Sequence, residues 1–171
     1  MANEFRLIGL NGSPSSSSKT HTVAARAVEL AGDGEVIDLG SLDANALLGR
    51  GSAPDVTATL QAIEGATALV LATPVYRATF SGLLKVLLDQ LPQQALLGKA
   101  CILTATGGSA HHSLVIDTGL RPLVASLDGW SVPTSLYATG DDFDADGNLS
   151  DAKSLVLSQA VAEARSVTTT R

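Results

Sequence analysis

Short apolar runs of strand length recur along this chain and are separated by longer segments with the periodicity of a helix. Uninterrupted apolar runs of this kind are typical of parallel strands that are buried on both faces of a sheet. The runs predict five strands, at Leu7–Leu10, Val36–Leu39, Ala68–Ala72, Ala100–Thr104 and, with a weaker pattern, Val132–Tyr137.

The segments between these strands carry apolar residues on one helix face. In the clearest of them, apolar residues stand at i, i+3, i+4, i+7, i+8 and i+11 from Phe80 to Leu91, and Pro92 ends the pattern. Gly119 and Pro122 interrupt another segment, which we therefore expect to form a distorted helix. The predicted helices are Val23–Ala31, Asp55–Ile63 after an exposed loop at Gly49–Pro54, Phe80–Leu91, His112–Ser126 and Asp151–Arg165.

The alternation of strands and helices predicts an α/β fold. Parallel neighbours need crossover connections, and helices must cover both faces of the sheet. Five strands in a chain of 171 residues fit a flavodoxin-like three-layer sandwich, with a five-stranded parallel sheet of order 2-1-3-4-5. We expect residues 1–171 to form a single domain, because the chain is too short for two domains of ordinary size.

The chain is acidic and poor in charged residues. Its formal net charge is -6, and it has no cluster of Lys and Arg that could neutralise phosphates, so neither nucleic acid nor an anionic membrane is an expected partner. Only 16% of the residues are charged, which favours an oligomer with part of its surface covered.

The single cysteine, Cys101, cannot form an intramolecular disulfide, and the N-terminal segment resembles neither a signal peptide nor a membrane span. We therefore expect a cytoplasmic protein in which Cys101 has a packing role.

The turn after the first strand carries the clearest functional pattern. Residues 12–20 read Gly-Ser-Pro-Ser-Ser-Ser-Ser-Lys-Thr and connect a buried strand to the start of a helix. Unpaired amides and the positive end of the helix dipole converge at such a turn, and hydroxyl groups and Lys19 add donors and charge, so the pattern predicts a phosphate site. The alternative is a serine-rich loop that only caps the helix. A P-loop kinase is disfavoured, because Ser13 and Ser18 stand at the glycine positions of that motif and no aspartate follows the third strand.

Two more loops follow predicted strands at the same edge of the sheet. In this strand order, ligands bind beyond the carboxyl ends of the strands, beside the point where the order reverses. The loop at 73–82 supplies an aromatic ring, a cation and a proline-fixed backbone, and the loop at 105–109 has two adjacent glycines that let a ligand approach the backbone. The alternatives are a surface arginine at Arg77 and a plain turn at the glycines. Together, the three loops predict a site for a mononucleotide with a planar heterocyclic base.

These three loops and the segment Asp117–Pro122 resemble the NADPH-dependent FMN reductases, and most closely the flavin reductase component of alkanesulfonate monooxygenase systems. The resemblance covers roughly residues 6–140. It implies an NAD(P)H:FMN oxidoreductase that uses NADPH or NADH and supplies reduced flavin to a separate flavin-dependent monooxygenase. It also implies a homodimer or homotetramer, which family members often pack through the helix that matches Phe80–Leu91.

The same resemblance implies a set of FMN-binding residues. The phosphate would be held by Ser13, Ser15, Ser18, Lys19 and Thr20. The isoalloxazine ring and ribityl chain would be lined by Pro74, Val75, Tyr76 and Arg77, and the ring edge would be contacted by Thr106, Gly107 and Gly108.

Thr118 departs from the pattern of the closest relatives. Those reductases carry an aromatic residue at this position, in a distorted helix, where it stacks between subunits and helps the flavin to come and go. Thr118 cannot stack, so the sequence leaves open whether FMN is an exchangeable substrate or a bound prosthetic group. Gly119 and Pro122 still predict the helix distortion itself.

The expected chemistry needs little from side chains. Hydride transfer from nicotinamide C4 to flavin N5 requires two rings held face to face and no general acid or base, so we nominate no catalytic side chain.

His111 and His112 lie at the predicted rim and are interpreted as structural or solvated, since a metal site would need further ligands. Residues 141–146 alternate acidic side chains like a calcium loop, but Lys153 stands where the bidentate glutamate belongs. We therefore predict a solvated acidic turn and no metal site.

Two other functions with the same fold stay open. A reductase of quinones, azo dyes or metal ions with bound FMN would use the same loops. A non-enzymatic electron carrier of the flavodoxin type would also bind FMN, but it would need flanking aromatic rings. Tyr76 is the one ring that the sequence places near the site, and we expect Trp130 and Tyr137 to lie elsewhere. The sequence does not decide between NADH and NADPH.

Overall fold

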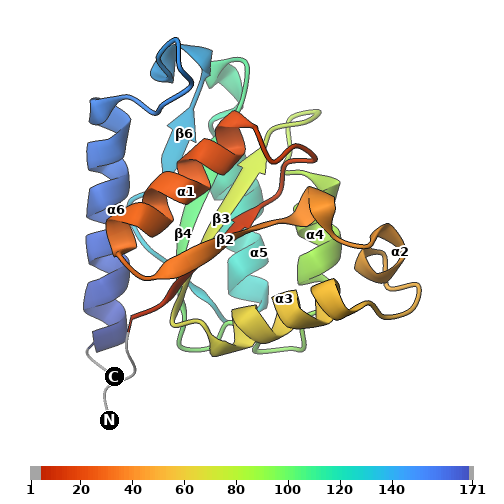
Figure 1. Ribbon diagram of the computed structural model, residues 1–171. Coiled ribbons are helices and arrows are strands. Elements are labelled where there is room, and N and C mark those ends of the chain that lie inside the picture. Colours follow the sequence, from red (N-terminus) through yellow and green to blue (C-terminus); the bar gives the residue numbers. More distant parts are fainter. Residues whose placement is uncertain (1–4, 170–171) are drawn as a thin grey trace.

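A computed structural model of the protein describes residues 5–169. Its centre is one parallel sheet in the order β2-β1-β3-β4-β5, with β6 also paired to β4 (Figure 1). The predicted fold class and strand order are confirmed. The strands are β1 (Leu7–Asn11), β2 (Gly34–Asp38), β3 (Ala68–Pro74), β4 (Ala100–Thr106), β5 (Trp130–Ser131) and β6 (Leu136–Ala138).

Helices connect the strands as the sequence predicts. The first begins at Ser18, whose side chain accepts a hydrogen bond from the His21 amide, and it ends at Gly32, whose φ of 79° only glycine adopts easily. The α-helices are α1 (Lys19–Ala31), α2 (Ala44–Leu47), α3 (Pro54–Gly65), α4 (Gly82–Leu88), α5 (Arg121–Ser126) and α6 (Asp151–Thr169). Shorter turns of 3-10 helix lie at Leu39–Ser41, Ala110–His112 and Gly140–Asp142, and a π-helix lies at Ile116–Leu120.

The helices cover both faces of the sheet and complete the three layers (Figure 1). One core lies between the sheet and α1 with α6, and the other lies between the sheet and α3, α4 and α5. Side chains of β3 alternate between the two cores, with Val70 in the first and Leu69 and Leu71 in the second. Because both faces are buried, the central strands have apolar residues at successive positions.

The fifth predicted strand differs from the structure. In place of one strand at Val132–Tyr137, the chain pairs with β4 twice, through the short strands β5 and β6. Pro133, which lies between them, has no N–H to donate to a ladder, and the carbonyl oxygens of Val132 and Pro133 accept hydrogen bonds from the Arg121 guanidinium instead. The interruption thus follows from the proline and from a side chain of α5.

Two of the predicted helices are shortened or divided in the structure. The helix predicted at Phe80–Leu91 begins at Gly82, because Ser81 caps it. After its last residue, Leu88, and the C-cap Asp89, the chain continues to Pro92 with i+3 hydrogen bonds. The helix predicted at His112–Ser126 is divided into a 3-10 turn, the π-helix and α5, so the expected distortion is confirmed. The short helix α2 was not predicted, because its four residues are too few to show a period.

The structure also shows the surroundings of the single cysteine and the character of the helices. Cys101 is fully buried in β4, and burial raises the pKa of its thiol to about 12. The thiol therefore stays protonated at neutral pH and packs as an apolar group. Among residues 5–169, no helix is both long and apolar enough to span a bilayer.

Candidate functional site

Loops from four strands meet at the carboxyl edge of the sheet, at the top of Figure 1. The loops after β3, β4 and β6, together with the start of α1, enclose an open cleft of about 370 Å³. Seven of the predicted site residues line the cleft: Lys19, Pro74, Val75, Tyr76, Thr106, Gly107 and Gly108. The end of β6 and the loop after it supply the remaining lining residues, which the sequence pattern did not predict: Ala138, Thr139, Gly140 and Asp141.

The turn at residues 12–20 adjoins the cleft and is shaped by Asn11, a fully buried residue at the end of β1. The Asn11 side-chain oxygen accepts a hydrogen bond from the Ser13 amide at 3.1 Å. Its nitrogen donates to Asp38 Oδ1 at 2.7 Å and to the Ser15 carbonyl oxygen at 3.4 Å. One side chain thereby ties the turn to both β1 and β2.

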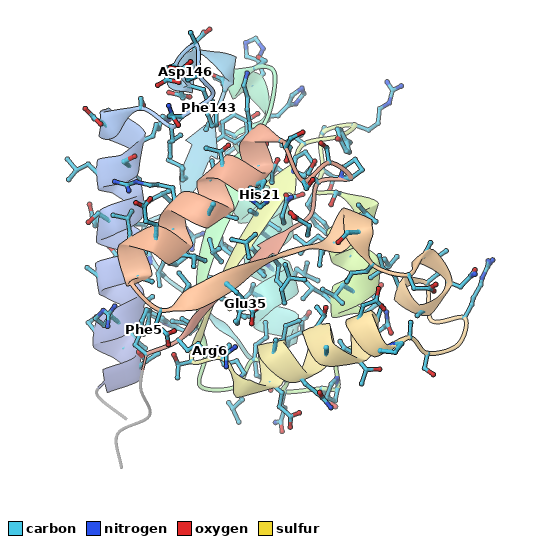
Figure 2. All side chains as sticks on the ribbon, viewed as in Figure 1. Phe5, Arg6, His21, Glu35, Phe143 and Asp146 are labelled. Atoms are coloured by element: carbon cyan, nitrogen blue, oxygen red, sulfur yellow. The ribbon has the colours of Figure 1, made fainter. Side chains whose placement is uncertain are left out.

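Asp38 extends this network to the first turn of α1. Asp38 Oδ1 lies 2.7 Å from His21 Nδ1, while the His21 amide donates to the Ser18 hydroxyl at 3.1 Å. Figure 2 shows His21 on α1, beside the end of β2. The network therefore fixes the start of the helix relative to the turn that precedes it.

The turn leaves a group of backbone amides without acceptors. The Gly12, Ser13 and Ser15 amides donate within the fold, to Ala72 O, Asn11 Oδ1 and Ser13 Oγ. In the part of the chain that the structure describes, the amides of Ser16, Ser17, Lys19 and Thr20 have no hydrogen-bond acceptor. Free amides grouped at a helix N-terminus, where the dipole is positive, form a site for an anion such as phosphate.

Hydrogen bonds hold the separate loops in a fixed relation. Thr20 Oγ1 and Thr106 Oγ1 share a buried hydrogen bond of 2.6 Å, which joins α1 to the end of β4. The Val75 amide donates to Thr106 O at 2.8 Å, which joins the loop after β3 to the same residue. Buried Ser13 and Thr20 thus use their hydroxyl groups to shape the site, and their predicted contacts with phosphate stay a prediction.

The loop after β3 turns back on itself in a two-residue hairpin. Tyr76 and Thr79 exchange two backbone hydrogen bonds, of 3.0 and 3.1 Å, around Arg77 and Ala78. Both central residues have a positive φ, 51° for Arg77 and 64° for Ala78, which in such turns is usual for glycine and asparagine. Strained backbone of this kind often occurs at ligand sites. Here it presents the exposed Tyr76 side chain at the cleft and places Arg77 outside the cleft lining.

Relief of this strain gives a stability prediction. Ala78→Gly is expected to raise the free energy of unfolding by about 0.5–1 kcal/mol, because a left-handed conformation costs alanine roughly 1–2 kcal/mol and glycine little. Ala58→Gly, at an exposed position inside α3, is the control and should lower the same quantity by about 1 kcal/mol. Urea unfolding of both variants measures the difference, and a destabilised Ala78→Gly protein would show that the hairpin is not strained.

The glycine loop after β4 rests against Tyr137. The Gly107 amide donates to Ala138 O at 3.0 Å, and the Tyr137 hydroxyl donates to Ser109 O at 2.7 Å. A Cβ on Gly107 would overlap Tyr137 Oη and lie 3.1 Å from Tyr137 Cζ. The expectation that Tyr137 lies away from the site is therefore wrong, because its ring supports the loop from behind. Burial raises the pKa of Tyr137, so its hydroxyl remains a donor at neutral pH.

Comparison with known proteins shows the family to which the chain belongs. The sequence profile of the family described as NADPH-dependent FMN reductase matches residues 5–144. The chain belongs to this family. It is accordingly an NAD(P)H-dependent FMN reductase, an enzyme of a family whose substrates are FMN and NAD(P)H.

Individual relatives agree with this assignment. The reductase is 38% identical over 151 residues to the NADH-dependent FMN reductase SfnF of Pseudomonas fluorescens, covering 84% of this chain and 81% of that protein. It is 36% identical over 152 residues to the FMN reductase (NADPH) of Pseudomonas aeruginosa, covering 84% and 82% of the two chains. The crystal structure of the NADH:FMN oxidoreductase EMOB in its apo form superposes with a TM-score of 0.85 at 35% identity, covering 94% and 88%. A flavodoxin of Streptococcus pneumoniae, at 13% identity and a TM-score of 0.59, shares the fold alone.

The π-helix of the reductase lies at the position where the sequence predicts a distorted helix. Thr118 is exposed within it, and its hydroxyl donates to Leu114 O at 2.8 Å. Gly119 allows the Phe80 ring to pack closely, since a Cβ there would lie 2.9 Å from Phe80 Cδ1. The distorted helix therefore packs closely against the segment that precedes α4.

The remaining polar residues that the sequence singled out form no further cluster at the site. His111 and His112 are exposed, and His111 Nδ1 lies 3.1 Å from Ser109 Oγ. In the acidic turn, the Asp144 carboxylate accepts hydrogen bonds from Asn148 and from the Asp146 amide, and these lower the pKa of Asp144. Among the described residues, no group of three His, Cys, Asp or Glu side chains is arranged to hold a metal ion.

Proposed function

We propose that the reductase binds FMN with its phosphate at the turn of residues 12–20 and its ring in the adjoining cleft. The observation that carries this proposal is the group of four free amides at Ser16, Ser17, Lys19 and Thr20, placed beside a cleft whose walls are backbone-rich loops. The amides and the helix dipole suit a phosphate dianion. The cleft, between Pro74–Tyr76 and Thr106–Gly108, suits a flat ring that hydrogen-bonds to backbone groups.

In the proposed reaction, hydride passes from C4 of the nicotinamide to N5 of the flavin. The C4–H bond breaks and an N5–H bond forms, so that two electrons and one proton move together. The protein contributes the alignment of the two rings and the charges around them, and no side chain has to transfer a proton in this step.

The resemblance to the flavin reductase components of two-component systems supports a finer proposal. In it, the product, reduced FMN, leaves the enzyme and supplies a separate flavin-dependent monooxygenase. We also propose a homodimer or homotetramer, which the exposed leucines Leu97, Leu114 and Leu155 support. We also propose a cytoplasmic location, which the single, buried cysteine Cys101 supports.

An assay of the purified protein tests this proposal. Oxidation of NADH or NADPH, followed at 340 nm, should depend on added FMN, and the isolated protein should be colourless if FMN is an exchangeable substrate. A yellow protein that oxidises NAD(P)H with a quinone, an azo dye or a metal ion instead would support the alternative reductase. A yellow protein that oxidises neither nucleotide would support an electron carrier.

A charge placed at the helix cap tests the phosphate site separately. Ser18→Asp is expected to weaken FMN binding at least about tenfold relative to Ser18→Asn, because the carboxylate repels the phosphate while both side chains still cap α1. Riboflavin, which lacks the phosphate, should bind the two variants equally. Fluorescence titration with each ligand gives the four dissociation constants. Equal affinities of the two variants for FMN would place the phosphate elsewhere.

A further inference from the structure

Lys19 belongs to two parts of the site at once. Its amide is one of the four free donors at the helix N-terminus, whereas its side chain lines the cleft. The Lys19 ammonium lies 5.4 Å from the centroid of the Phe143 ring, and 3.4 Å from the point that a Cβ on Gly140 would occupy. Figure 2 shows Phe143 on the loop that follows β6, at the same end of the sheet as the start of α1. The side chain therefore reaches toward the loop after β6.

The Lys19 ammonium, unlike those of other lysines, has no acceptor or anionic partner within the described part of the protein. Lys85 pairs with Asp89, Lys99 donates to two carbonyl groups, and Lys153 donates to Tyr137 O. Within residues 5–169, the Lys19 ammonium forms neither a hydrogen bond nor an ion pair, and its one defined contact is the aromatic ring. A cation–π contact holds an ammonium in place without neutralising it. The site thus contains an oriented positive charge with no negative partner.

We propose that Lys19 acts on the flavin ring and stabilises the reduced product over oxidised FMN, in place of the phosphate contact that its position in the sequence suggests. This inference rests on the proposed function. Hydride transfer adds two electrons and one proton to FMN, so the product carries one more negative charge until it takes a proton from water. A fixed ammonium beside the ring favours the more negative form, which makes the reduction thermodynamically easier. Lys19 is then a charge-tuning residue for the reaction.

The surroundings of Lys19 make this effect selective for the ring. The free amides of the turn already supply the phosphate with donors, and the Lys19 side chain extends from that turn to the loops that form the cleft. Asp141 also lines the cleft but makes no ion pair with Lys19 among the described residues. Phe143 places the ammonium, because its ring lies under the charge, and it acts only through Lys19. Removal of the Phe143 ring should therefore weaken the effect of Lys19 on the flavin and have no separate effect of its own.

The test compares oxidised and reduced ligands in the Lys19→Gln variant. Equilibrium reduction with a reference dye should give a midpoint potential for bound FMN about 30 mV more negative than in the parent protein, which corresponds to a tenfold loss in affinity for the reduced form relative to the oxidised form. Riboflavin should show the same shift, because the ring is unchanged. Lys19→Arg should restore most of the parent potential. Lys85→Gln, which removes an exposed charge on α4, is the matched control and should leave the potential unchanged.

Phe143→Leu is the second variant and should shift the potential in the same direction by a smaller amount. The inference is overturned if Lys19→Gln leaves the potential unchanged. It is also overturned if Lys19→Gln weakens the binding of oxidised FMN but not the binding of riboflavin, which would make Lys19 a phosphate ligand. A rise in the KM for NAD(P)H with no other change would overturn it as well. Failure of the parent protein to bind either flavin would instead contradict the proposed function. Titration of the parent protein with both flavins therefore separates failure of this inference from failure of the proposed function.

Discussion

Asn11→Ala is expected to lower the free energy of unfolding by about 3 kcal/mol and to weaken FMN binding by more than about tenfold. Asn11 is fully buried, and its side chain makes three hydrogen bonds that join the end of β1 to Asp38 and to the turn at residues 12–20. Alanine would leave the buried Ser13 amide and the Asp38 carboxylate without this partner. The free amides of the turn would then no longer be fixed around one point.

A second asparagine provides the matched control. Asn45 is exposed on α2, so Asn45→Ala should change the free energy of unfolding by no more than about 0.5 kcal/mol and should leave FMN binding unchanged. Urea unfolding and FMN titration measure both quantities. If Asn11→Ala were as stable as Asn45→Ala and bound FMN equally well, the buried network would not shape the phosphate turn.

Gly107→Ala is expected to lower the free energy of unfolding by about 2 kcal/mol, because its Cβ would overlap the Tyr137 hydroxyl, which is held by Ser109 O. Tyr137→Phe removes that hydroxyl and should cost about 1 kcal/mol for the lost hydrogen bond. In the double variant the overlap with the Tyr137 hydroxyl is gone, so its cost should be smaller than the sum of the two single costs by at least about 1 kcal/mol.

The neighbouring glycine controls for loss of backbone freedom. A Cβ on Gly108 would meet no atom within 4 Å, so Gly108→Ala should change the free energy of unfolding by no more than about 0.5 kcal/mol. Thermal unfolding of the four variants, each with and without FMN, completes the test. Strictly additive costs in the double variant would show that Tyr137 does not set the shape of the glycine loop.

The sequence predicts the fold well where burial dictates the pattern. The strands at β1, β3 and β4 are buried on both faces, so their apolar runs are visible in the sequence. The last strand is short and divided, and its position depends on Pro133 and on hydrogen bonds from Arg121. Such a long-range side-chain contact leaves no periodic pattern.

The candidate site is predicted in part for the same reason. Glycine, proline and serine mark the loops after β1, β3 and β4, and seven of the predicted residues line one cleft. Asn11, Asp38 and Tyr137 act by contacts between distant segments, as in the Asn11–Asp38 hydrogen bond, which spans 27 positions. Their residue types occur equally in unrelated roles, so only the structure reveals these contacts. The loop after β6 was not predicted to line the site, because β6 pairs with β4 through only three residues and so short a strand leaves no clear pattern in the sequence.

A crystal structure of the protein with FMN tests the central claim most directly. We expect the FMN phosphate within hydrogen-bond distance of the amides of Ser16, Ser17, Lys19 and Thr20, and the ring between residues 74–76 and 106–108. FMN bound with its phosphate away from that turn, or with its ring outside the cleft, would contradict the account.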